Sequence, residues 1–198
     1  RQQLRDEIVV DLLPRAFTRS QRLYAYLDPS ARWLVVDSAA PRRAEELLAM
    51  LRESLGSLRA RPLAVQRSPA ERMTRWIERR PPAGFVLSDE CELREPLENG
   101  GVVRCRRQPL VADEVAAHLE AGKQAVRVAL EWQGRLACVL GDDLAVRRLR
   151  FLDVVQDEAD RSAGDDAADR FDVDFALMTL ELRQFVPALV DAFGGEAD

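Results

Sequence analysis

The sequence is poor in the residues on which most hydrolytic and metal sites depend. Its 198 residues include one histidine, His118, and three cysteines, Cys91, Cys105 and Cys138. The cysteines are odd in number, lack CxxC spacing and stand among apolar residues, so we expect buried free thiols instead of disulfides or a zinc site. His118 lies in a helical pattern without a neighbouring serine or cysteine nucleophile, which argues against its acting as a catalytic base.

Glycine-rich phosphate loops and long apolar runs are also missing. Neither the GxxxxGK(S/T) pattern nor the GxGxxG pattern occurs, so nucleotide hydrolysis is not indicated. The longest apolar runs, in WLVVD and FALM, are far shorter than the roughly 18 residues that a membrane span needs. The sequence therefore predicts a cytoplasmic protein that needs no cofactor and has no membrane partner.

Charge is abundant and unevenly distributed. Charged residues make up 32% of the chain, and the formal net charge is −5. Residues 1–112 contain 20 arginines and 15 acidic residues, whereas residues 113–198 contain 9 basic and 19 acidic residues. This asymmetry permits a basic working surface on an acidic protein. Only Lys123 is a lysine; arginine suits phosphate contacts through its planar fork, but genome composition explains the same bias equally well.

Hydrophobic spacing and turn residues predict alternating helices and hairpins along the first half of the chain. The clearest helix start is at Ser68, because a capping residue, a proline and a reciprocal glutamate follow in the right order, and Met73, Trp76 and Ile77 then form a buried stripe. The other expected elements are a helix over 4–12 broken by Pro14, strands at 22–27 and 33–38, a helix over 44–55 ended by Gly56, and a short strand at 62–66.

The second half continues the same pattern. The turn Asn99-Gly100 predicts a hairpin, because both residue types tolerate the backbone that tight turns require. The expected elements are strands at 84–92 and 102–108, a helix over 113–121, and strands at 123–132 and 135–140 that pair as a second hairpin across Gln133-Gly134. A helix over 147–160 follows, and then a long packing helix from Phe171 to Phe193 that Pro187 kinks or divides.

These elements predict an α+β fold of antiparallel hairpins and small sheets packed with helices. We expect three regions along the chain. They are a central hairpin-plus-helix region over 1–60, a projecting basic subdomain over 61–112, and a C-terminal sheet and long-helix region over 113–198.

Two groups of basic residues are candidates for binding the DNA backbone. Arg104, Arg106 and Gln108 alternate onto one face of a strand, and Arg107 stands on the other. The second group is a helical stripe of Arg72, Arg75 and Arg79; Arg15, Arg19 and Arg22 form a smaller set near the start. No aromatic residues are interleaved, which favours duplex over single-stranded DNA. The alternative is that these arginines pair with Glu71, Glu78, Glu92 and other carboxylates on a solvated face.

Acidic stretches offer a rival function. Carboxylates that converge on one cleft hold Mg²⁺ in metal-dependent nucleases. Here the first turns of a helix already favour negative charge, so most of these side chains are better explained as solvated helix residues. The candidates are Asp142, Asp143, Asp165, Asp166, Asp169, Asp172 and Asp174.

Several segments resemble the RdgC family, recombination-associated proteins of many proteobacteria. The resemblance follows the whole chain in order, and it corresponds to the C-terminal two-thirds of the family pattern, without its N-terminal segment. Val111-Ala112 and Leu180 depart from it, where we expect Thr-Ser and Gly. The runs that carry it are DLLPRAFTR at 11–19, WLVVD at 33–37, RRAEELLAMLRESLGSL at 42–58, DECELRE at 89–95, GGVVRCRRQ at 100–108, HLEAGKQ at 118–124, RRLRFLD at 147–153 and RFDVDFALMT at 170–179.

The resemblance implies a ring-shaped homodimer around double-stranded DNA that binds without sequence preference and restrains RecA by competing for DNA, in the nucleoid and without catalysis. Phe17 ends an apolar run beside a helix-breaking proline, so we expect it to lie at the dimer interface. Two other functions stay open. One is a metal-dependent nuclease that uses the C-terminal aspartates, and the other is a protein–protein interaction module that does not bind DNA.

Overall fold

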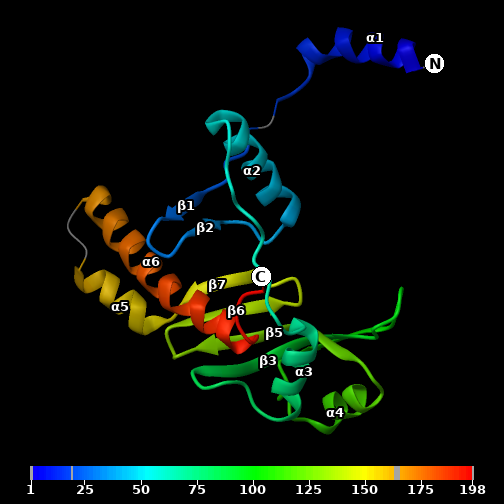
Figure 1. The fold of residues 1–198 in the computed structure, drawn as a ribbon, viewed down its shortest axis with the longest axis vertical. Helices are drawn as coiled ribbons and strands as arrows, with labels where there is room; N and C mark the ends of the chain where they lie inside the picture. Colours follow the sequence, from blue (N-terminus) through cyan, green and yellow to red (C-terminus); the bar gives the residue numbers. More distant parts are fainter. Residues whose placement is uncertain (1, 19, 163–165, 198) are drawn as a thin grey trace. The chain divides into compact units, whose positions relative to one another are not determined.

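The computed structural model describes residues 2–18, 20–162 and 166–197, and it divides the chain into two compact units (Figure 1). The first unit ends at Ser57 and the second begins at Leu58. Among the described residues, no helix combines the length and the apolar character that crossing a membrane requires.

The first unit contains the hairpin that the sequence predicted. Strands β1 (Ala25–Asp28) and β2 (Trp33–Val36) pair in antiparallel fashion, and the carboxylate of Asp28 accepts hydrogen bonds from the backbone N–H groups of Ser30 and Ala31 in the turn. Gly56 ends α2 with a left-handed φ of 75°, as predicted. The helical elements of this unit are α1 (Gln2–Leu12), the short 3₁₀ helix η1 (Leu13–Arg15) and α2 (Pro41–Leu55).

The second unit is built on one antiparallel sheet in the order β4-β3-β5-β6-β7. Both predicted hairpins of this region are confirmed, since β3 pairs with β4 and β5 pairs with β6. The strands are β3 (Phe85–Arg94), β4 (Val102–Arg106), β5 (Gln124–Trp132), β6 (Leu136–Gly141) and β7 (Val146–Phe151), and the helices are α3 (Pro69–Glu78), α4 (Asp113–Glu120), α5 (Asp153–Ser162) and α6 (Ala167–Ala192).

Helices α3 and α6 pack on the same face of this sheet. The ring of Trp76 on α3 lies 5.1 Å from that of Phe193, at the end of α6, and Phe185 meets Trp132 of β5 edge-on at 5.7 Å. The Thr74 hydroxyl of α3 accepts a hydrogen bond of 2.8 Å from the backbone N–H of Ala125. The predicted capping residue is confirmed, because the Ser68 side chain accepts from the backbone N–H three residues on.

One expected element and the first part of another are wrong, and both errors come from long-range pairing. Residues 62–66 form no strand; Val65 makes an isolated bridge to Glu196 instead, next to the last turn of the chain. The segment 147–151 is predicted to be helical but lies in β7, because the open edge of β6 supplies hydrogen-bond partners that outweigh local preference. Arg148 there has a positive φ of 52°, beside a register irregularity.

The long helix α6 stays one element through Pro187. Its predicted packing stripe is buried only in the second half, where Leu182, Phe185 and Leu189 lie in the core. In the first half Phe171 is 65% exposed, so its prediction as a packing residue is wrong. The fold class is α+β, as predicted; strands from 61–112 and from 113–198 share one sheet, and the three-region division of the chain stays a prediction.

Candidate nucleic-acid interface

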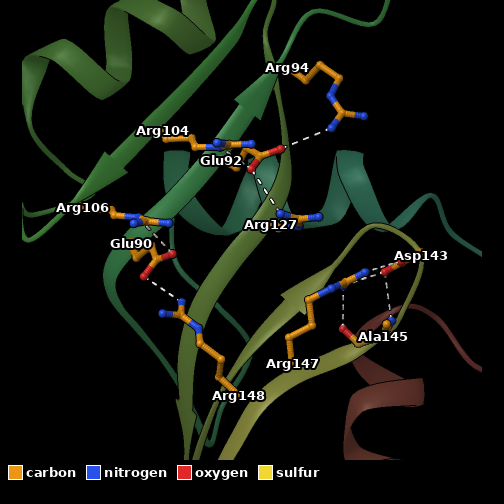
Figure 2. A network of polar contacts seen from close by, with 10 residues as sticks. All are labelled: Glu90, Glu92, Arg94, Arg104, Arg106, Arg127, Asp143, Ala145, Arg147 and Arg148. Carbon is orange, nitrogen blue, oxygen red and sulfur yellow. Dashed lines mark hydrogen bonds and ion pairs between the residues drawn. The ribbon is translucent and has the colours of Figure 1, made fainter. Parts of the chain in front are cut away.

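Charged side chains gather on the face of the sheet opposite α3 and α6. Alternation along β3 and β4 turns Cys91 and Cys105 toward the core and their neighbours outward. Glu92 is the Cα partner of both Arg104 on β4 and Arg127 on β5, so these three side chains meet. We call the full set the arginine face; it comprises Arg94, Arg104, Arg106, Arg127, Arg147 and Arg148 with the carboxylates of Glu90, Glu92 and Asp143 (Figure 2).

Glu92 is the centre of this network. Its carboxylate accepts hydrogen bonds from Arg104 Nε at 2.9 Å, from Arg94 Nη2 at 3.2 Å and from Arg127 Nη1 at 3.3 Å. The residue is only 5% exposed. Burial alone would raise the pKa of Glu92, but the hydrogen bond from Arg104 and the charges of Arg127 and Arg104 outweigh burial and hold the pKa below its ordinary value.

The other two carboxylates are arranged in a similar way. Glu90 lies 2.7 Å from Arg148 Nη2 and 3.6 Å from Arg106 Nε. Asp143 accepts a hydrogen bond of 2.9 Å from Arg147 Nη1, which lowers the pKa of that carboxyl against the opposing effect of burial. Each carboxylate is therefore paired with at least one guanidinium group.

The arginine face carries excess positive charge that is exposed to solvent. Its six arginines share three carboxylates, so the set carries a net formal charge of +3. The side chains of Arg104 and Arg106 are 63% and 68% exposed. Because shared carboxylates fix the guanidinium groups while leaving them open, the surface is preorganised to bind a polyanion such as a DNA backbone.

Replacing Glu92 by glutamine is expected to lower the free energy of unfolding at pH 7 by about 1–3 kcal/mol, because three guanidinium groups lose a shared charged acceptor. Since the pKa of Glu92 is lowered on folding, its contribution is complete above the unfolded-state pKa and is lost as the pH falls through the folded-state pKa. Urea unfolding from pH 7 to pH 3 should show the wild-type and variant stabilities converging in acid.

The exposed Glu120 of α4 provides the matched control for this titration, as Glu120→Gln should leave the stability close to the wild type at every pH. Parallel pH curves for wild type and Glu92→Gln would show that the ionised form of Glu92 is not what stabilises the sheet.

Sequence comparisons agree with the resemblance noted from the residues. A family model described as "Putative exonuclease, RdgC" matches residues 1–196. The chain belongs to the RdgC family. Proteins named "Recombination-associated protein RdgC" from Pseudomonas paraeruginosa and Pseudomonas syringae pv. syringae are 49% and 46% identical over 197 residues, which is 99% of this chain. The chain spans 64% of the length of these relatives.

In this RdgC-family chain the predicted DNA-binding residues do not all lie on one surface. Arg104 and Arg106 lie together on the arginine face. The alternation ends with β4 at Arg106, and Arg107 turns the chain with a positive φ of 55°. Gln108, which the sequence predicted on the same face as Arg104, instead lines a pocket of about 660 Å³ together with Arg107 and Arg79.

The remaining arginines of the α3 stripe differ from one another. Arg72 donates from Nε and Nη2 to the backbone carbonyl of Ala192, at 3.2 and 3.0 Å, and so ties α3 to the C-terminal end of α6. This position also places its positive charge at the negative end of the α6 dipole. Arg75 is exposed on the surface of α3. Of the smaller set near the start of the chain, Arg15 and Arg22 lie in the first unit, and Arg19 lies outside the described residues.

Several arginines of the arginine face were not among the residues predicted to bind DNA. Arg127 alternates with Val126 and Val128 in β5, and that alternation is the signal that could have found it. Arg147 and Arg148 were assigned to a helix, so their place in the sheet was not foreseen. The expected alternative, pairing with Glu92, is confirmed for Arg104.

Two aspartates of the rival nuclease hypothesis, Asp166 and Asp143, have structural roles. Asp166 caps α6 and accepts hydrogen bonds of 2.8 Å from the backbone N–H groups of Ala168 and Asp169. Asp143 pairs with Arg147, and Asp165 lies outside the described residues. Within residues 2–18, 20–162 and 166–197, no three side chains of His, Cys, Asp or Glu gather closely enough to hold a metal ion.

Two further expectations concern single side chains. Phe17 is fully exposed in the first unit, after η1, and its place at a dimer interface stays a prediction. Cys91, Cys105 and Cys138 are free and buried, as predicted. Burial raises the pKa of Cys138 to about 12, so this thiol stays protonated and unreactive.

Proposed function

We propose that this chain binds duplex DNA without sequence preference and without catalysis. In this proposal it acts as a ring-shaped homodimer in the cytoplasmic nucleoid and restrains RecA-mediated recombination by competing for DNA. The observation that carries the proposal is the arginine face, where six guanidinium groups share three carboxylates on an open sheet surface.

Hydrogen-bonding capacity supports phosphate binding on this face. A guanidinium group has five N–H donors, and the bond from Arg104 to Glu92 uses its Nε. Donors that remain can bind phosphate oxygens without breaking the ion pair. The DNA backbone then meets arginines whose orientation is already set, which reduces the entropy lost on binding.

The kind of nucleic acid follows from the lining of the same face. The hollow at its centre is lined by charged residues together with Cys91 and Val139, and none of its lining residues is aromatic. Binding of single strands depends largely on stacking bases against aromatic rings, whereas duplex phosphates need only cations. We therefore propose duplex DNA as the ligand, with Arg72, Arg75, Arg79, Arg107 and Gln108 as a second group of backbone contacts.

Replacing Arg104 and Arg106 together by alanine should weaken duplex binding at low salt. Each lost phosphate contact reduces the slope of log K against log salt by about 0.9, so the slope should fall by up to about two units. Fluorescence anisotropy with a labelled duplex across a KCl series measures both effects. Competition by unrelated duplexes should be nearly even, because backbone contacts carry no sequence information.

The control is Arg161→Ala, which removes one exposed arginine from α5, away from the arginine face. Its salt slope should match that of the wild type. An unchanged slope in the double variant would mean that the DNA contacts lie elsewhere. A hundredfold preference for one duplex would contradict the proposed ring and favour a sequence-specific repressor.

The proposed dimer leads to a separate prediction for Phe17. Its side chain is fully exposed and large, and such residues anchor protein interfaces when a partner covers them. Phe17→Ser should weaken self-association and DNA binding together, measured by sedimentation velocity and by anisotropy. Normal sedimentation and normal DNA binding would show that Phe17 is not an interface residue.

The two alternatives are tested with the same protein. The family model's description names an exonuclease, and the nuclease hypothesis predicts Mg²⁺-dependent degradation of linear or plasmid DNA. No degradation would leave binding as the function. An interaction module without DNA binding is excluded if DNA retains the protein at low salt and releases it at high salt.

A further inference from the structure

A second feature of the sheet unit lies beside the arginine face and differs from it chemically. This pocket, of about 660 Å³, is formed by the end of α3, the first part of β3 and the segment between β4 and α4. We call it the Arg79 pocket. Its volume is within the range of small-ligand and peptide side-chain sites. Its lining includes Trp76, Ile77, Leu110, Arg79, Arg80 and Arg107.

The floor of the Arg79 pocket is apolar. Trp76, Ile77 and Leu110 are buried, and Leu87 is half-buried beside them. In the described part of the chain, the buried Nε1–H of Trp76 has no hydrogen-bond partner. An unsatisfied buried donor is unfavourable, so a ligand oxygen that reaches it would be bound favourably.

The rim of the pocket is basic, and its arginines are free of ion pairs. Arg79, Arg80 and Arg107 are exposed, and no carboxylate of the described residues lies within ion-pair distance of them. Asp89 is the single acid in the lining. The arginine face is different, because each of its guanidinium groups already has a carboxylate partner. The pocket therefore combines an apolar floor with an excess of two positive charges.

The rim arginines can contact a DNA backbone, but the apolar floor does not match DNA. A duplex backbone presents phosphates and no apolar group that would fill the floor. An unpaired base would need an aromatic face for stacking. The ring of Trp76 already packs against Phe85 at 6.1 Å and Phe193 at 5.1 Å, and the other apolar lining residues are aliphatic or proline.

We propose that the Arg79 pocket binds an acidic peptide segment of a partner protein that carries a large apolar side chain. The apolar side chain fills the floor above Ile77 and Leu110, and the flanking carboxylates pair with Arg79, Arg80 and Arg107. Arg79, Arg107 and Gln108 also belong to the proposed DNA contacts, so on these residues the inference overlaps the proposed function. Arg80 and Val111 belong to the pocket alone, and variants at these two residues therefore separate peptide binding from DNA binding.

The test uses the full chain and a fluorescein-labelled peptide, Gly-Asp-Glu-Asp-Leu-Phe, with binding measured by anisotropy. A second peptide, Gly-Asp-Glu-Asp-Ser-Ser, has the same charge and no apolar side chain. The first peptide should bind at least about tenfold more tightly than the second, because only the first fills the floor. Equal affinity for the two peptides, or no binding of the first, would overturn the proposal.

Two variants locate the site. Val111 is 83% exposed on the rim, so Val111→Asp should fold normally and repel the peptide, and Arg80→Ala should remove one ion pair. Each should weaken peptide binding by about fivefold or more, and Arg161→Ala should not change it. Unchanged affinity in both pocket variants would overturn the proposal. So would variants that weaken binding of a 12-nucleotide single strand but not of the peptide, which would make the pocket a nucleic-acid site.

Discussion

Phe185→Ala is expected to lower the free energy of unfolding by about 4 kcal/mol, the largest effect of any substitution considered for this chain. Phe185 is fully buried on α6, where its ring lies 5.7 Å from that of Trp132 and 6.3 Å from that of Phe85. Truncation removes the apolar contact and leaves a cavity between rigid aromatic neighbours that cannot close over it.

The same helix supplies the control. Phe171 is 65% exposed, so Phe171→Ala removes the same atoms from a site where little apolar surface is buried, and it should change stability by less than about 1 kcal/mol. Guanidinium unfolding followed by tryptophan fluorescence and circular dichroism compares the two variants. Equal losses would mean that the first half of α6 is covered in solution, for example by a second copy.

Arg135→Met is the second large prediction, with an expected loss of roughly 3 kcal/mol. Arg135 follows the β5–β6 turn, and its guanidinium donates at 2.6 Å to Glu181 and at 2.8 Å to Glu158. Glu181 on α6 is 3% exposed. Without Arg135 its buried charge lacks a counterion, which costs more than the ion pair itself contributes.

The double variant Arg135→Met/Glu181→Leu separates these two costs. Removing both charges eliminates the uncompensated carboxylate, so the double variant should be more stable than Arg135→Met alone. Chemical unfolding of the wild type, both single variants and the double variant completes the cycle. Additive losses would show that the two side chains do not stabilise each other.

The parts of the fold that the sequence predicted are those with local causes. Ser68 and Pro69 mark the start of α3 because capping depends on neighbours in sequence. The turns at Asn99 and at Gln133-Gly134 likewise lie within a few residues of the strands they join. Asn99 and Gln133 both adopt the positive φ that such turns require.

The parts that were missed depend on contacts between distant residues. Residues 147–151 have a helical spacing, yet they form β7 because the edge of β6 offers backbone N–H and C=O groups that need hydrogen-bond partners. The same limit applied to the candidate site. Alternation predicted that Arg104 and Arg106 share a face, but it could not show that Glu92 joins them to Arg127, which is 35 residues further along the chain than Glu92. Register between strands is a tertiary property.

The bridge between Val65 and Glu196 joins the two ends of the sheet unit. The backbone N–H groups of Gln66 and Arg67 donate to the carbonyls of Gly195 and Phe193, so the entry and exit of the unit run side by side. A domain whose ends lie close together can be inserted into a loop of another protein, or circularly permuted at a different turn, with little strain. The arginine face and the Arg79 pocket both belong to this unit, so we expect both to be retained when the unit is inserted into another protein.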